Sequence, residues 1–128
     1  MTRRCFLSSA ILCASCSQPT KSLAEVLPTQ LGTRSRRRVR AISADRYPPL
    51  IASLGVSKAA SAEYQGEGQV EVQIYEMKVA TSAFELIQKW PQQDSLAIHK
   101  GPYFVVAKSS EADQKSVGVF LREFRAKL

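Results

Sequence analysis

Cysteine, histidine and tryptophan are scarce in this chain, and their positions limit the chemistry available to it. Three cysteines, one histidine and one tryptophan occur among 128 residues, and all three cysteines precede residue 17. His99 is the only histidine and lies beside a Lys-Gly-Pro turn, so neither a catalytic triad nor a multi-histidine metal site is expected within one chain. The sequence therefore predicts no catalytic residue, no metal site and no cofactor.

Long apolar runs are also missing. No run approaches the about 20 apolar residues that a membrane-spanning helix needs, so no transmembrane segment is expected. Apolar residues nevertheless make up 45% of the chain, which is too many for a disordered tail. The length is that of one small globular domain, able to bury a single modest core.

Residues 1–24 read as an export signal, with a short basic head followed by a short, weakly apolar stretch. The head resembles the twin-arginine consensus, which the twin-arginine export machinery recognises. The residues that carry this resemblance are Arg3, Arg4, Phe6 and Leu7. The protein is therefore predicted to be periplasmic or secreted.

Two processing sites compete within this leader, and an uncleaved leader is a third alternative. Small residues at Ser22 and Ala24 suit a signal peptidase, which predicts cleavage after Ala24. The small residues before Cys16 resemble a lipoprotein box without its usual leucine, which would make the protein a membrane-anchored lipoprotein. Cleavage after Ala24 would leave a chain without cysteine, whereas lipidation would use Cys16.

Positive charge is concentrated in one segment. Without residues 1–24 the chain keeps 15 basic and 11 acidic residues, and five of the 15 lie between residues 34 and 40. Guanidinium groups at this density suit phosphates, so we name a candidate anionic-surface site. It comprises Arg34, Arg36, Arg37, Arg38 and Arg40. No aromatic residue interleaves with them, so nucleic acid is not an expected partner. The alternative is that residues 25–46 form a solvated, flexible lead-in that aids solubility.

Residues 47–128 are predicted to form a single α+β domain. Turn and cap signals divide it into a short helix (47–55), two strands (56–65 and 69–78), a helix capped by Thr81–Ser82 (to residue 90), two more strands (95–99 and 103–107) and a final helix after Ser109–Ser110. These elements make two strand-turn-strand-helix units. We expect a four-stranded antiparallel sheet with helices largely on one face.

The alternation of apolar residues slips within segment 69–78. Val70, Val72 and Ile74 are spaced to face one side, but Tyr75 and Met77 follow in the other phase. Either a bulge occurs there or both faces of the strand are covered.

Two candidate sites follow from side-chain chemistry. An aromatic set, Tyr64, Tyr75, Trp90 and Tyr103, would line a groove for an apolar ligand, although such residues more often form core. Glu71 and Glu76 would serve acid–base chemistry if hairpin carboxylates met in a cleft, although they are more simply solvent contacts.

One further pattern extends over most of residues 27–128. It consists of Leu27–Pro28, Leu31–Gly32, Ala62–Tyr64, Gly66, Gly68, Val70–Met77, Ala83–Phe84 and Gly101–Val106. This pattern resembles a family of exported bacterial proteins of unknown function, found notably in acidobacteria. It implies an exported α+β domain and supplies no catalytic residue, and the arginine run lies outside it.

The preferred function is that of a non-catalytic exported domain that binds an unknown envelope protein, an envelope surface or a small apolar ligand. The alternatives are a small envelope enzyme that uses hairpin carboxylates and a lipoprotein anchored at Cys16.

Overall fold

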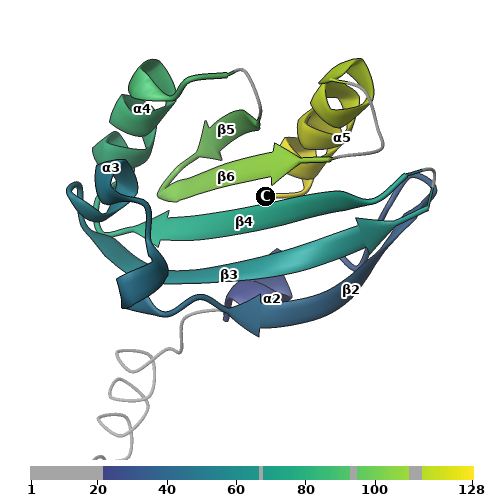
Figure 1. The fold of residues 1–128 in the computed structure, drawn as a ribbon, viewed down its shortest axis with the longest axis horizontal. Helices are drawn as coiled ribbons and strands as arrows, with labels where there is room; N and C mark the ends of the chain where they lie inside the picture. The colour runs from purple at the N-terminus through teal and green to yellow at the C-terminus, as the bar shows by residue number, and fades with distance from the viewer. Residues whose placement is uncertain (1–21, 67, 93–94, 110–113) are drawn as a thin grey trace, which may run out of the picture.

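Six strands form one curled antiparallel sheet in the computed structural model, which describes residues 22–66, 68–92, 95–109 and 114–128 (Figure 1). The strands are β1 (Gln30–Leu31), β2 (Arg34–Ala41), β3 (Val56–Gln65), β4 (Val70–Met77), β5 (Leu96–Lys100) and β6 (Tyr103–Lys108). Their order across the sheet is β1-β2-β3-β4-β6-β5, and each neighbouring pair is antiparallel.

The four strands expected between residues 56 and 107 are confirmed, as is the α+β class. β3 and β4 form a hairpin across a turn in which Gly68 has a φ of +82°. β5 and β6 form a second hairpin across Gly101, whose φ is +56°. Glycine adopts these left-handed conformations without the penalty that a Cβ atom brings, which is why the turn signals were informative.

The prediction of four strands is wrong, because segment 25–46 contributes β1 and β2 to the sheet instead of leading into it. β2 pairs with β3 from Ser35 to Ala41. The charged composition of β2 gave no strand signal. The two-residue β1 pairs only with the start of β2, at Arg34 and Ser35, so the rest of β2 lies at the edge of the sheet and needs little apolar surface. In that part Val39 packs against the core, and a bulge lies between Arg37 and Arg40.

Helices cover both faces of the sheet, so the expectation of helices largely on one face is also wrong. On the first face, α2 (Leu23–Val26) and α5 (Gln114–Lys127) enclose a cluster that includes Tyr64, Phe120 and Phe124. On the second face, α3 (Pro49–Ala52) and α4 (Ala80–Lys89) enclose a separate cluster with Phe104. The two clusters meet opposite sides of β6, whose apolar run is buried on both faces as predicted.

The slip in β4 marks the point at which the second face becomes covered. Val70, Val72 and Ile74 belong to the first cluster, whereas Tyr75 and Met77 belong to the second. The pairing of β4 with β6 runs without a shift from Glu71 to Glu76, so the slip in β4 reflects covering of both faces. Ahead of Tyr75, this face of β4 carries the partly exposed Glu71 and Gln73, and in the part of the chain that the structure describes no helix lies over them (Figure 1).

The last two helices differ in how well the sequence located them. α5 buries the predicted stripe of Val117, Phe120, Leu121 and Phe124. α4 begins at Ala80, ahead of the expected Thr81–Ser82 cap. The hydroxyl of Ser82 donates instead to the carbonyl of Leu54 at 3.3 Å, which ties α4 to the loop after α3.

Polar contacts fasten the N-terminal segment to the sheet. The buried Tyr64 hydroxyl donates to the carbonyl of Pro28 at 2.6 Å. Arg36 donates through Nη1 to the carbonyls of Ala24 and Leu27, at 2.7 and 2.8 Å. These bonds satisfy carbonyls at the end of α2, which the short helix leaves without intrahelical partners. Segment 22–31 is therefore part of the fold.

Candidate functional site

The uncovered half of the second sheet face is hollowed. It contains a cavity of about 520 Å³ whose lining includes Arg40, Arg46, Ser61, Glu71, Gln73 and Tyr75. A second cavity of about 280 Å³ adjoins it and is lined by Pro48, Glu71, Gln73, Trp90, Ser95, Val106 and Lys108. Because the two share Pro48, Glu71 and Gln73, they form one groove across β2, β3, β4 and β6, which we call the sheet groove.

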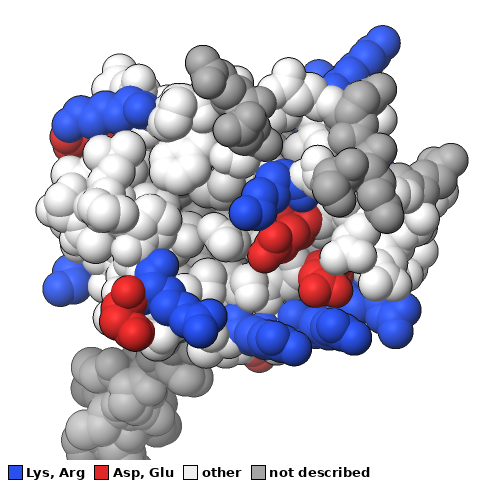
Figure 2. Space-filling view, in the orientation of Figure 1, with Lys and Arg blue, Asp and Glu red and all other residues white. Residues whose placement is uncertain are grey.

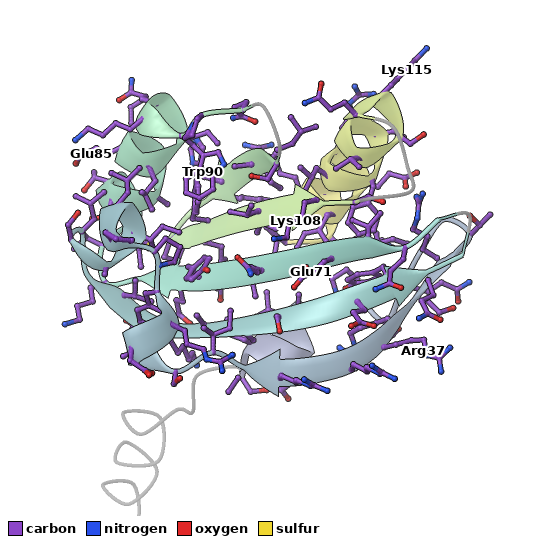
Figure 3. The ribbon with its side chains drawn as sticks, viewed as in Figure 1. Arg37, Glu71, Glu85, Trp90, Lys108 and Lys115 are labelled. Atoms are coloured by element: carbon purple, nitrogen blue, oxygen red, sulfur yellow. The ribbon has the colours of Figure 1, made fainter. Side chains whose placement is uncertain are left out.

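A row of charged residues crosses the sheet at this groove. The register places Arg37 opposite Glu63, Glu63 opposite Glu71 and Glu71 opposite Lys108. The two adjacent carboxylates repel each other, and the cations at each end of the row offset this cost. Figure 3 shows Glu71 and Lys108 over the middle of the sheet, between β4 and β6. In Figure 2 the basic residues over β2 form a rim of blue beside the acidic groups.

Tyr75 closes the floor of the groove where the covered half begins. Its ring packs edge-on against Tyr47 at 5.9 Å between centroids, and its hydroxyl donates to Oε1 of Gln73 at 3.0 Å. Burial raises the pKa of Tyr75 to about 12. The phenol therefore remains protonated at neutral pH and acts as a hydrogen-bond donor, not as a base.

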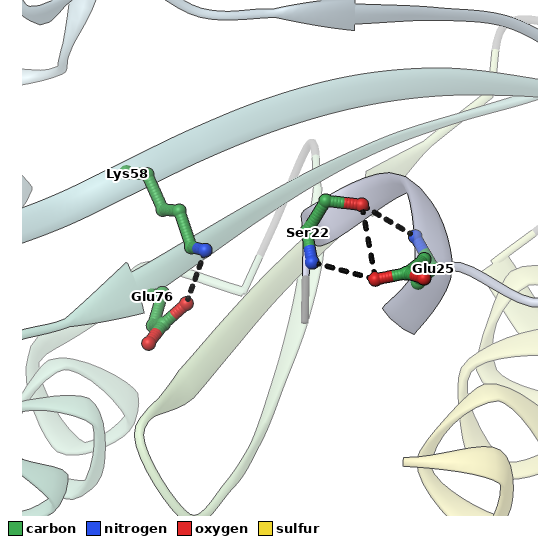
Figure 4. A network of polar contacts seen from close by, with 4 residues as sticks. All are labelled: Ser22, Glu25, Lys58 and Glu76. Atoms are coloured by element: carbon green, nitrogen blue, oxygen red, sulfur yellow. Dashed lines mark hydrogen bonds and ion pairs between the residues drawn. The ribbon is translucent and has the colours of Figure 1, made fainter. Parts of the chain in front are cut away.

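The carboxylates named from the sequence do not meet. Glu71 and Glu76 have opposite phase in β4, so they lie on opposite faces, and Glu76 pairs with Lys58 at 3.7 Å (Figure 4). The structure instead brings Glu63 opposite Glu71, a pair that only the register of β3 with β4 reveals. His99 packs its ring against Phe84 at 5.6 Å and contributes to neither cavity of the sheet groove.

The arginine run is divided between structural and exposed roles. Arg34 donates through Nε to the carbonyl of Gly68 at 3.1 Å and lies over the Phe120 ring, while Arg36 binds the end of α2. Arg37 donates to Oε1 of Gln65 at 2.8 Å. Arg38 and Arg40 are exposed, and Arg38 has a φ of +51° within the bulge.

The four aromatic residues do not line one groove. Tyr64 lies in the core of the first face, and Tyr103 packs against that same cluster. Tyr75 and Trp90 lie on the second face, where each lines one part of the sheet groove. The indole of Trp90 packs on Phe104 at 5.3 Å, and its buried Nε1 has no hydrogen-bond partner among the described residues.

Sequence reasoning missed Arg46, Ser61, Gln73 and Lys108 as groove residues. A signal for one of them was present, because Gln73, like Glu71, alternates with buried apolar residues of β4, which marks a polar strand face. Arg46 and Lys108 come from separate segments, and only the fold brings these to the same hollow.

Five residues named for the leader lie outside the residues that the structure describes: Arg3, Arg4, Phe6, Leu7 and Cys16. The expected cleavage site at Ala24 is described. Ala24 falls inside α2, whose N-cap Ser22 forms a reciprocal capping box with Glu25 (Figure 4). Leu23, one residue before Ala24, is 5% exposed and part of the first-face core. Cleavage after Ala24 would therefore remove both a core residue and a helix cap.

Comparisons with protein-family models, with curated proteins and with solved structures find no match to this chain. In the part of the chain that the structure describes, no helix is long and apolar enough to cross a membrane. Over the same residues, no cluster of three or more histidine, cysteine or acidic side chains is placed to hold a metal ion.

Proposed function

We propose that this protein is an exported, non-catalytic binding domain whose ligand site is the sheet groove. The observation that carries the proposal is the groove itself: one half of a sheet face has no helical cover, and a cavity of about 520 Å³ occupies it. Cavities that bind small molecules span about 300–1,000 Å³. The export part rests on the twin-arginine-like leader.

The polar lining favours a polar ligand, or a polar segment of an envelope protein, over the apolar ligand that the aromatic residues suggested. Gln73 and Ser61 offer hydrogen bonds, while Arg40, Glu71 and Lys108 offer charges. An apolar ligand would strip water from these groups without replacing the lost hydrogen bonds, which is costly.

Binding is favoured over catalysis by the placement of the acidic residues. The carboxylate pair of the enzyme alternative, Glu71 and Glu76, lies across the thickness of the sheet. The one tyrosine at the groove floor has its hydroxyl committed to Gln73. The groove thus presents fixed donors and acceptors, which suits recognition.

A thermal-shift screen of small polar compounds tests the proposal. A compound that binds only the folded chain at about 100 times its Kd stabilises it by about 2.7 kcal/mol, a clear rise in Tm. The rise should vanish in a variant carrying Glu71→Ala and Gln73→Ala. It should persist in a control carrying Arg122→Ala and Glu123→Ala on the exposed side of α5. Loss in the control alone would place the site elsewhere.

A lipoprotein anchored at Cys16 is a second candidate, which α2 favours. A chain beginning at Cys16 keeps the Ser22 cap and the buried Leu23, whereas a chain beginning at Glu25 loses both. Intact mass and N-terminal sequence of the protein from fractionated bacteria distinguish the two. A diacylglyceryl mass at Cys16, absent in Cys16→Ser, supports the lipoprotein, and an N-terminus at Glu25 refutes it.

The same preparation tests export. Replacing Arg3 and Arg4 with lysine should retain the protein in the cytoplasm if the twin-arginine machinery reads the leader. Unchanged export of this variant would contradict that route.

A further inference from the structure

Arg40 and Arg46 approach the sheet groove from different elements and line the same end of it. Arg40 is the penultimate residue of β2, and Arg46 ends η1 (Ala44–Arg46), a short helical turn that follows β2. Both side chains line the 520 Å³ cavity, and both residues are exposed. A guanidinium presents up to five N–H donors in a planar fork that matches phosphate and carboxylate oxygens.

The guanidinium groups of Arg40 and Arg46 remain available to a ligand, whereas three arginines earlier in β2 form hydrogen bonds within the chain. Arg34, Arg36 and Arg37 each donate to a carbonyl or amide oxygen of the chain. The backbone N–H of Arg46 donates to the carbonyl of Ser43 at 2.9 Å, but in the described part of the chain neither the guanidinium of Arg40 nor that of Arg46 donates a hydrogen bond to another residue. Arg46 does lie near the carboxylate of its neighbour Asp45, whose pKa is lowered first by a hydrogen bond from Ser43 and less by Arg46.

The charge of the groove as a whole is positive. Its lining holds three cations, Arg40, Arg46 and Lys108, against one carboxylate, Glu71. Glu71 lies directly opposite Lys108 across the β4–β6 pair, so Lys108 offsets its charge. The other end of the groove holds Arg40 and Arg46 against the nearby carboxylate of Asp45, so its net charge remains positive, and Ser61 lies there opposite Arg40.

From this placement we infer that the sheet groove binds a small soluble ligand through an anionic group, a phosphate or a carboxylate, held between Arg40 and Arg46. The inference deepens the proposed function and rests on it, since it names the ligand chemistry of the same groove. The hollow is concave and of small-molecule size, which favours a soluble anion over a membrane surface. The candidate site predicted from the arginine run thus keeps Arg40 and gains Arg46.

Titration of the ¹⁵N-labelled full chain with inorganic phosphate, at constant ionic strength, tests the inference. Phosphate should shift the amide resonances of residues 40–46. Replacing Arg40 and Arg46 with glutamine should weaken this binding by about 100-fold or more, because two charge-assisted bonds are lost and each is worth over a factor of ten. The matched control, Arg37→Gln with Arg38→Gln, removes the same charge from the same strand outside the cavity and should change affinity less than about two-fold.

Equal weakening of phosphate binding in both double variants would show a general attraction to the basic strand and overturn the inference. The absence of amide shifts at residues 40–46 would overturn it as well.

Vesicles of equal parts phosphatidylglycerol and phosphatidylcholine distinguish the source of the anion. Vesicle sedimentation that depends on Arg40 and Arg46, without phosphate binding, would identify a lipid headgroup and refute a soluble ligand. A neutral or cationic compound that binds the groove while phosphate does not would refute the anion and leave the proposed function standing.

Discussion

Leu27 offers a direct test of whether the N-terminal segment belongs to the fold. The side chain is 1% exposed and packs in the first-face core, at the C-terminal end of α2. Leu27→Ala removes three buried carbons, worth about 2.4 kcal/mol at about 0.8 kcal/mol each, and leaves a cavity that brings the expected cost to about 3 kcal/mol. At about 4 °C per kcal/mol for a domain near 100 residues, Tm should fall by about 12 °C.

Urea unfolding followed by circular dichroism measures the change, with thermal unfolding as a second readout. The control is Thr29→Ala, two residues along the same segment at an exposed position, for which less than about 0.5 kcal/mol is expected. If residues 25–46 were a flexible lead-in, Leu27→Ala would cost as little as the control. A loss below about 0.5 kcal/mol at Leu27 would therefore refute the packing of α2 against the sheet.

Three further predictions concern single side chains. Arg38→Gly should stabilise the protein by up to about 1 kcal/mol, because a non-glycine residue at a φ of +51° is strained; urea unfolding that shows a loss would contradict this. Tyr64→Phe should cost about 1–2 kcal/mol in the same assay, since the carbonyl of Pro28 loses its donor; no change would show that this bond is dispensable. Burial raises the pKa of Tyr64, and it raises that of Tyr75 to about 12. Because tyrosine in the unfolded chain ionises near pH 10, the two buried phenols contribute fully to the free energy of unfolding below about pH 10. This contribution is lost as the pH rises toward 12. Tyr75→Phe should make stability fall less steeply than wild type between about pH 10 and 12, and an unchanged slope would argue against its burial.

The sequence was most informative where local signals and burial agree. Val56–Gln65 was predicted as a strand with the bounds of β3, because glycines follow it and an alternating strand pairs with it. The stripe of Val117, Phe120 and Phe124 located the buried side of α5, since helical periodicity depends only on the chain itself.

The strand β2 was missed for a physical reason. Its arginines read as a solvated segment, but most of β2 extends past the short β1, and a strand at the edge of a sheet tolerates charge on both faces. Only the register with β3 shows that Arg36 lies opposite the buried Tyr64 and turns back to the carbonyls of α2. Tyr64 and the α2 carbonyls are separated from Arg36 in the sequence, so no local pattern predicts that they meet.

The groove could be predicted only in part. The polar phase of β4 at Glu71 and Gln73 was visible, and its slip at Tyr75 left two interpretations open, a bulge or covering of both faces. The choice between them depends on how far α3 and α4 extend over the second face, which is a property of packing. That Arg40 and Arg46 line the same cavity likewise depends on where the fold places η1, which no local pattern gives.

The most direct test of the sheet groove as the binding site is amide-resolved NMR of the ¹⁵N-labelled chain with the tightest compound from the polar library. Binding in the groove predicts shifts in residues 40–48, 61, 71–75 and 106–108 and in the indole N–H of Trp90, with α5 unchanged. Shifts confined to α2 and α5, on the opposite face of the sheet, would contradict the account.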